Sequence, residues 1–178
     1  MEVRVQQFLE QNNCHYLITK GAKNQEVFFT PADYRYYLRL LKKYKRQFSV
    51  MIYGFCLLSQ EVHLIVYLQD REMLSLFINA VNQSYSIYFN AKYQKQKSLW
   101  YRRFRSKLIN GNGNLEQYIQ WIEFKPVKNR LVNSIVEYPW SSCAYRVLGR
   151  SYPLLDTSLP LRSNGKKSIY TWLPLVLF

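Results

Sequence analysis

Glu61 and His63 are the side chains whose types and spacing most plainly allow chemistry. They fall within 55–68, an apolar stretch typical of a buried strand, a tight turn and a second strand. Side chains alternate between the two faces of a strand, so this pair leaves the sheet on one side, about 7 Å apart. A carboxylate and an imidazole at that spacing can share one divalent cation; the alternative is an ordinary surface pair. The chain has one other histidine, His15.

The elements that would hold this pair follow one another as strand, helix, strand, strand, helix and strand. Strands are predicted at 14–20, 48–58, 62–68 and 100–109. Helices are predicted from Thr30-Pro31 onward, from Asp70 to about Tyr93, and over 115–124, ended by Pro126. This order is the split β-α-β pattern. It predicts an α+β, ferredoxin-like fold with a four-stranded antiparallel sheet and helices packed on one face.

The 178 residues are enough for one domain with a real core, and 48% of them are apolar. We expect a single domain over residues 1–150, followed by an irregular, proline-containing tail over 151–178. No apolar run is long enough to cross a bilayer, and the N-terminus lacks the apolar core of a signal peptide. Three widely spaced cysteines predict buried free thiols. A cytoplasmic protein with no membrane partner is therefore expected.

The formal net charge of +14 predicts a polyanionic partner. Basic residues cluster in two segments, 35–46 and 92–107, and aromatic residues are interleaved with those of the second. Bases stack on aromatic rings while Lys and Arg hold phosphates. This mixture favours nucleic acid over an acidic membrane surface.

Several short motifs occur in order between about residue 14 and about residue 158. They are HYLITKG from His15, FF at 28–29, DY at 33–34, YL at 37–38, YFN at 88–90, LW at 99–100, RF at 103–104 with Ser106, EYPWSS from Glu137, and LLD at 154–156. In this order and spacing they resemble the single-tyrosine DNA transposases with a His-hydrophobic-His metal motif, especially the REP-associated tyrosine transposases.

The resemblance implies cleavage and rejoining of DNA, with single-stranded or hairpin DNA as the partner. In such an enzyme, two histidines and an Asn or Gln hold a divalent metal that polarises the scissile phosphate. One tyrosine attacks and stays joined to the 5′ end of the DNA, which conserves the bond for rejoining. The implied cofactor is Mg²⁺ or Mn²⁺ if the site is active, and none otherwise.

The residues that carry this chemistry in the family are the ones that differ here. The family's P-N-H-hydrophobic-H falls on 59–63, where Glu61 replaces the first histidine and only His63 is kept. The family's Y-I-E-x-N-P-V falls on 121–127, so Trp121 replaces the nucleophilic tyrosine and Lys125 replaces the third metal ligand. An indole has no ionisable oxygen, and a protonated lysine repels a metal. The resemblance therefore implies a degenerate active site.

Trp121 and Lys125 lie one helical turn apart and share a helix face. We hypothesise that the Lys125 ammonium occupies the space of the lost metal and pairs with Glu61. Tyr118 is the fallback nucleophile, although its spacing groups it with the core stripe of the same helix.

Three functions remain open from the sequence. The first is a DNA-binding protein of this family with cleavage and rejoining lost or impaired. The second is an active metal-dependent transposase or nickase that uses Glu61, His63 and a substitute tyrosine. The third is an RNA-binding module of similar fold. The expected DNA contacts are Lys20, Lys23, Trp100, Arg102, Arg103, Arg105 and Lys107, in a monomer or homodimer.

Overall fold

The computed structural model describes residues 13–96, 98–101, 103–109, 112–149 and 151–156. Its centre is a four-stranded antiparallel sheet of order β2-β3-β1-β4. The strands are β1 (Cys14–Lys20), β2 (Met51–Leu57), β3 (Glu61–Tyr67) and β4 (Arg105–Leu108). The predicted α+β, ferredoxin-like fold class is confirmed.

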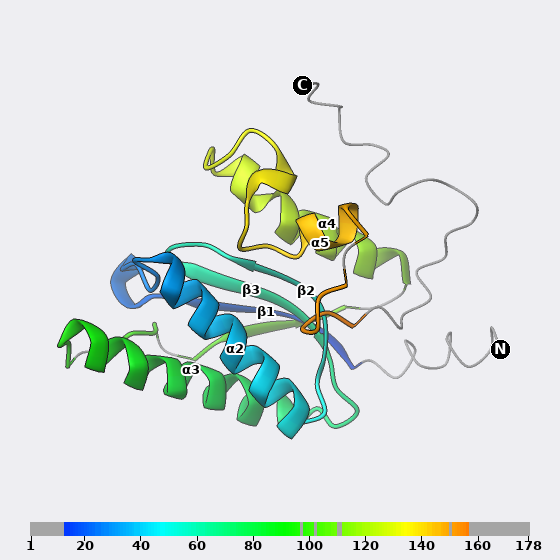
Figure 1. Cartoon of the computed structure of the whole chain (residues 1–178). Helices are drawn as coiled ribbons and strands as arrows, with labels where there is room; N and C mark the ends of the chain where they lie inside the picture. The colour runs from blue at the N-terminus through cyan, green and yellow to red at the C-terminus, as the bar shows by residue number, and fades with distance from the viewer. Residues whose placement is uncertain (1–12, 97, 102, 110–111, 150, 157–178) are drawn as a thin grey trace.

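The helices lie on both sides of this sheet (Figure 1). As predicted, α2 (Pro31–Gln47) and α3 (Met73–Tyr93) pack together on one face. The helix α4 (Asn112–Lys128) packs on the opposite face, against β2 and β3. Three short helices complete the described chain: η1 (Ala22–Asn24), η2 (Ile135–Glu137) and α5 (Cys143–Val147). The face that carries α4 is the one that matters for the candidate site.

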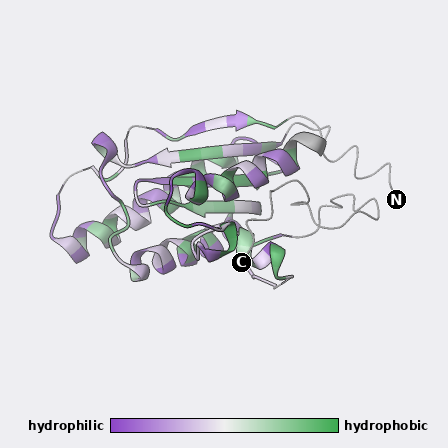
Figure 2. Cartoon of the chain, turned by 90° about the horizontal axis from the view of Figure 1, so that it is seen from above, coloured by the Kyte–Doolittle hydropathy of each residue, from purple (hydrophilic) through white to green (hydrophobic). Residues whose placement is uncertain are grey.

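Strand alternation divides the core into two apolar layers. In β3, Val62, Leu64 and Val66 face α2 and α3, whereas Ile65 and Tyr67 face α4. Figure 2 shows the interior strands mostly in the hydrophobic colour and the edge strand β4 mostly in the hydrophilic one. A sheet covered on both faces gives nearly continuous apolar strands, which explains why β2 and β3 are buried almost throughout.

Several predicted element bounds differ from the observed ones, and two are wrong by the most. The strand expected over 100–109 is shorter, because β4 pairs with β1 only over four residues and Trp100 contributes only an isolated bridge to Gly21. Pro126 does not end the last major helix, since α4 continues to Lys128. The Pro126 carbonyl then accepts a hydrogen bond from the Leu131 amide at 2.9 Å.

The end of the described chain packs on the body. Leu154 is buried in the layer beneath α2, and the Asp156 carboxylate accepts hydrogen bonds from Lys45 Nζ at 2.5 Å and from the Ile52 amide at 2.7 Å. Residues 151–156 belong to the predicted irregular tail, and they form no helix or strand. They nevertheless pack against the domain through Leu154 and Asp156. The rest of the predicted tail, 157–178, lies outside the described residues.

Over the described residues, no helix combines the length and the apolar character needed to span a bilayer.

Candidate functional site

The register between β1 and β3 builds one side of the candidate site. Lys20 lies directly opposite Glu61, and Ile18 lies opposite His63, so all four side chains point to the α4 face. Lys20 Nζ is 2.9 Å from Glu61 Oε2 in a cross-strand ion pair.

His63 lies under this ion pair with both ring nitrogens engaged. It is fully buried; Nε2 is 2.7 Å from Glu61 Oε1 and Nδ1 is 2.8 Å from the Tyr16 hydroxyl. Burial lowers the pKa of His63, although the Glu61 carboxylate opposes the shift, so the ring is neutral at pH 7. A carboxylate only accepts, so Nε2–H donates to Glu61 and Nδ1 accepts from the hydroxyl of Tyr16.

Glu61 is held as a carboxylate by its neighbours. The hydrogen bond from His63 and the contact with Lys20 lower its pKa to about 2. The Lys125 ammonium of α4 is the third group near this carboxylate, with Nζ 4.0 Å from Glu61 Oε1. Burial lowers the pKa of Lys125, while the charge of Glu61 acts to raise it. Two lysines and a histidine thus converge on one carboxylate, as the hypothesised Lys125–Glu61 pairing requires.

Aromatic rings form the rest of the site. The Trp121 indole is 44% exposed and packs edge-on against Tyr16 at 5.3 Å and His63 at 6.2 Å between ring centroids. Lys125 Nζ lies 4.2 Å from the centroid of the Trp121 ring, within cation–π range. Tyr118, which the sequence groups with the core stripe of α4, is half-buried at the edge of that core. Its ring centroid lies 5.9 Å from that of Tyr16. The structure therefore brings the predicted residues 61, 63, 118, 121 and 125 together.

These residues do not fit a divalent metal. No group of three or more His, Cys, Asp or Glu side chains capable of holding a metal ion occurs in the described parts of the chain. His63 offers no free lone pair, because its Nδ1 accepts from Tyr16 and its Nε2 donates to Glu61. The third family position supplies an ammonium, which is no ligand while protonated. The donor set suits a salt-bridge network rather than Mg²⁺ or Mn²⁺.

The predicted DNA contacts divide into three groups. Trp100 is only 9% exposed, and its Nε1 donates to the Asn82 carbonyl at 3.1 Å, so the expected stacking platform was wrong: the ring is part of the core. Arg102 lies outside the described residues. The other five are exposed: Lys20, Lys23, Arg103, Arg105 and Lys107. All of these except Lys107 line one pocket.

Sequence reasoning missed two residues, Tyr16 and Tyr101. Tyr16 shares the strand parity of Ile18 and Lys20, so alternation along β1 places its ring on the His63 face. Tyr101 is 46% exposed, directly after buried Trp100, and lines the same pocket as the basic residues. Alternation along an extended chain also places Trp100 and Tyr101 on opposite sides, so it could have predicted that one ring is buried and the other exposed.

Replacing the site carboxylate tests the network. Glu61→Gln is expected to lower the free energy of unfolding by about 1–3 kcal/mol at pH 7, because Lys125 is left half-buried beside Lys20 without its counter-charge. The folded-state pKa of about 2 lies below the ordinary value of 4.5. The stabilisation is therefore full above about pH 5 and is lost as the pH falls toward 2. Urea unfolding at several pH values measures it.

The matched control is Glu26→Gln, which removes an exposed carboxylate. It is expected to change the free energy of unfolding by less than about 0.5 kcal/mol at every pH. Equal effects of the two variants would contradict the network.

The fold defines a class: an α+β, ferredoxin-like protein, here with a cluster of ion pairs and aromatic rings on the α4 face of its sheet. A sequence profile of the family described as "Transposase IS200 like" matches residues 10–124, which is more than half of the chain. The chain belongs to this IS200-like transposase family, and the resemblance inferred from its motifs is confirmed.

A curated relative from Haemophilus influenzae, named as a candidate REP-associated tyrosine transposase, is 33% identical over 67 residues. This match covers 36% of the present chain and spans only 38% of the relative's length. A solved structure of a REP-associated tyrosine transposase bound to a REP hairpin superposes with a TM-score of 0.66 at 16% identity, covering 83% of this chain and 87% of that one. A bacterial tRNA(His) guanylyltransferase-like protein in complex with GTP gives 0.50 at 10% identity over 73% and 71% of the two chains. At these identities the structures show a shared fold.

Proposed function

We propose that this protein binds DNA that carries a hairpin and a single-stranded flank, and that it no longer cleaves it. One arrangement supports the proposal: Trp121, where the resemblance implies the nucleophilic tyrosine, packs on His63, and Lys125, where it implies a metal ligand, faces Glu61. The lysine charge takes over part of the metal's electrostatic role and none of its Lewis-acid role. The net charge of +14 and the exposed basic residues near the site supply affinity for phosphates.

The hairpin partner is suggested by the structural relative, which was solved with a REP hairpin. The similar fold and the family membership extend that ligand class to this chain as a proposal.

An active enzyme with a substitute tyrosine is the second candidate, and Tyr16 is the observation in its favour. Its hydroxyl lies 2.8 Å from His63 Nδ1, where a general base would sit. Burial, together with the charge of Glu61, raises the pKa of Tyr16, which opposes formation of the attacking phenolate. Tyr118 is the other tyrosine beside Tyr16, and among the described residues it makes no hydrogen bond to His63.

One experiment separates these functions. The wild-type chain is incubated with a labelled DNA hairpin that carries single-stranded flanks, with Mn²⁺ or with EDTA. We expect binding that weakens steeply with salt, by a slope in log affinity of about −0.7 to −0.9 per phosphate contacted. We expect no covalent protein–DNA band on a denaturing gel under either condition.

A covalent band that depends on Mn²⁺ would overturn the loss of cleavage, and its absence in Tyr16→Phe or Tyr118→Phe would then identify the nucleophile. Tighter binding to an RNA hairpin of the same sequence would favour the RNA-binding module instead. Binding to neither nucleic acid would contradict the proposal as a whole.

A further inference from the structure

The helix α2 carries a row of basic side chains on its outer side. They recur every three or four residues and are exposed or half-buried: Arg35, Arg39, Lys42, Lys43 and Arg46. At that spacing they share one side of the helix and follow it for about 16 Å. Among the described residues, none of the five forms an ion pair with a carboxylate. We call these five residues the α2 cationic face.

Keeping these charges together works against the stability of the helix. Like charges four residues apart repel, and the face contains three such pairs, 35/39, 39/43 and 42/46. The acidic residue of α2, Asp33, is buried and bonded to Lys92, so it does not compensate them. Lys45 is the contrast, because its ammonium pairs with Asp156 at 2.5 Å. A bound polyanion would supply the counter-charges that the α2 cationic face lacks.

A pocket of about 360 Å³ opens along this face. Tyr152 and Pro153 form one wall, and the other wall carries three cations of the face: Arg35, Arg39 and Lys42. Its described lining contains no carboxylate. The first wall is fixed in place, because the Tyr152 ring stacks on Tyr145 at 4.2 Å between centroids and the Leu155 amide donates to the Tyr152 carbonyl at 2.9 Å. The three cations therefore border a preformed recess that can hold a phosphodiester group.

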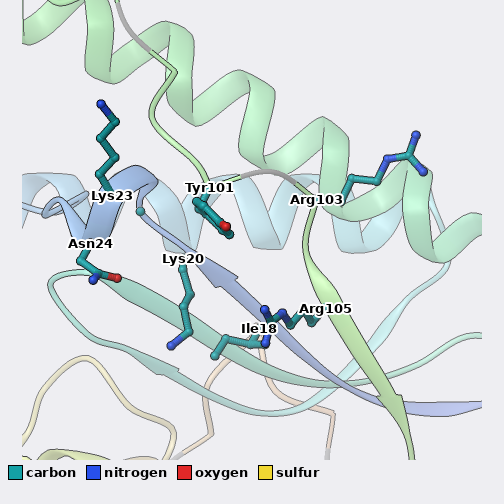
Figure 3. A pocket seen from close by; sticks show the side chains of 8 residues that line it. Ile18, Lys20, Lys23, Asn24, Tyr101, Arg103 and Arg105 are labelled. Atoms are coloured by element: carbon teal, nitrogen blue, oxygen red, sulfur yellow. The ribbon is translucent and has the colours of Figure 1, made fainter.

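The α2 cationic face and the candidate site lie on different sides of the molecule. Figure 1 shows α2 and α4 on opposite faces of the sheet. The pocket beside the candidate site, drawn in Figure 3, is built by β1, η1 and the segment before β4. The pocket along α2 borders β2, at the other edge of the sheet, since Tyr152 packs on Phe55 at 6.1 Å between ring centroids. A hairpin bound at the candidate site thus leaves the α2 cationic face open to a second partner.

The chemistry of this face fits the phosphates of a duplex better than unpaired bases or a membrane. Guanidinium and ammonium groups bind phosphates, whereas unpaired bases also need free aromatic rings on which to stack. The rings here are already stacked, Tyr36 on Tyr88 at 3.9 Å and Tyr152 on Tyr145. A membrane surface would need apolar side chains beside the charges, and the leucines of α2 are buried in the core.

We propose that the α2 cationic face binds the phosphate backbone of a second DNA duplex while the hairpin occupies the α4 side, so that one protein molecule bridges two segments of DNA. The hairpin half of this inference rests on the proposed function, and the second duplex goes beyond it. Contacts made to phosphates carry no sequence information, so duplexes of unrelated sequence are expected to bind equally well.

The first test measures binding of the full chain to a blunt duplex without a hairpin, by fluorescence anisotropy at several salt concentrations. The triple variant Arg35→Gln/Arg39→Gln/Lys42→Gln is expected to bind this duplex at least about tenfold more weakly, with a salt slope lower by about 2–3, the value for three phosphate contacts. Its affinity for the flanked hairpin is expected to stay unchanged. Its thermal midpoint is expected to equal or exceed that of wild type, because glutamine is a good helix former and the repulsion is removed.

The second test measures bridging itself. A flanked hairpin is fixed to beads and loaded with protein, and a fluorescent blunt duplex is then added. Wild type is expected to retain the duplex, and the triple variant is expected to stay on the hairpin but to release the duplex. The matched control is Arg71→Gln/Lys95→Gln/Arg130→Gln, which removes three exposed cations outside the α2 cationic face and is expected to retain the duplex.

Retention of the duplex by the α2 triple variant, or equal losses in the two triple variants, would overturn the role of the α2 cationic face. Equal losses of hairpin and duplex in the α2 variant would overturn bridging, since both DNA molecules would then share one surface. Tighter binding to a duplex of RNA would overturn the assignment to DNA. Hairpin binding without duplex capture in wild type would overturn bridging alone, whereas duplex binding without hairpin binding would overturn bridging and the proposed function together.

Discussion

The double variant Glu61→His/Lys125→Asn is expected to bind one Mn²⁺ per chain, whereas the wild type binds none at this site. The substitutions supply the two ligand types that the family resemblance implies at these positions. His63 and residue 61 already share the α4 face, and Lys125 already reaches to 4.0 Å from Glu61. Isothermal titration calorimetry, with Mn²⁺ electron paramagnetic resonance as an independent readout, measures the gain.

The wild-type network explains why both changes are needed. With Glu61 present, His63 Nε2 carries the proton and donates it; without Glu61, the tautomer can reverse. Nδ1–H then donates to the Tyr16 hydroxyl, and the Nε2 lone pair faces the metal, which is the usual arrangement for a ligating histidine. Lys125→Asn removes the ammonium that would repel the ion and adds an amide oxygen.

Adding Trp121→Tyr gives a triple variant that restores a phenol at the nucleophile position. It is expected to form a covalent adduct with flanked hairpin DNA in Mn²⁺ and none in EDTA. The matched control for Mn²⁺ binding is the double variant Glu61→His/Lys128→Asn, which removes the same charge at an exposed position of α4. Mn²⁺ binding by wild type, or equal binding by the control double variant, would show that the site was never lost in the way proposed.

Local sequence signals predicted the bounds of an element well where a single local feature, such as a glycine or a helix cap, sets them. β1 was predicted at its observed bounds, because an apolar strand ends there at Gly21. The capping box at the start of α2 was visible as Thr30 followed three residues later by Asp33, and both of its hydrogen bonds are present. Such signals depend on neighbours in the sequence.

The side of the sheet covered by α4 could not be predicted in the same way. An apolar stripe specifies that a helix face is buried, and it does not specify the partner. The choice is made by distant contacts: Ser142 hydrogen-bonds Phe55 and the buried Glu123 carboxylate, and Arg146 contacts the same carboxylate and the Tyr53 carbonyl. These bonds link the EYPWSS motif and α5 to both α4 and β2.

The candidate site shows the same division between features predicted from the sequence and features set by distant contacts. Its members at 61, 63, 121 and 125 were predicted from the resemblance to the family's motifs, which carries long-range information that periodicity lacks. Tyr16 belongs to no part of the family's catalytic motifs quoted above, and only the cross-strand register places its hydroxyl on His63. Trp100 was misplaced because its sequence neighbours are basic, while its own indole is anchored on Asn82 in the core.

The second large effect concerns Asp33, and Asp33→Ala is expected to lower the free energy of unfolding by about 3 kcal/mol at pH 7. The carboxylate is fully buried and accepts five hydrogen bonds. Its donors are the Phe29 and Thr30 amides, both at 2.9 Å, the Tyr88 and Tyr93 hydroxyls at 3.0 and 2.7 Å, and Lys92 Nζ at 2.6 Å. Truncation leaves these donors without a partner where α2 begins and α3 ends, and urea unfolding measures the cost.

The effect of Asp33→Ala is expected to depend on pH with a definite sign. Burial alone would raise the pKa of Asp33, but the hydrogen bonds from Lys92 and Tyr93 and from the two backbone amides outweigh it and hold the pKa well below its usual range. A depressed pKa contributes stability that is present above about pH 4 and is lost as the pH falls further. The difference between wild type and Asp33→Ala should therefore shrink steadily in acid.

Asp70→Ala is the matched control, because Asp70 is an exposed carboxylate that accepts a single hydrogen bond, from the Glu72 amide at 2.8 Å at the start of α3. Its loss is expected to cost about 1 kcal/mol or less. If the two variants lost equal stability, or if the cost of Asp33→Ala persisted unchanged at pH 2, the five-donor carboxylate would not be the charged link between the two helices. The same link fixes Phe29 and Thr30 at the start of α2, a few residues after Lys23 and Asn24, which line the basic pocket beside the candidate site.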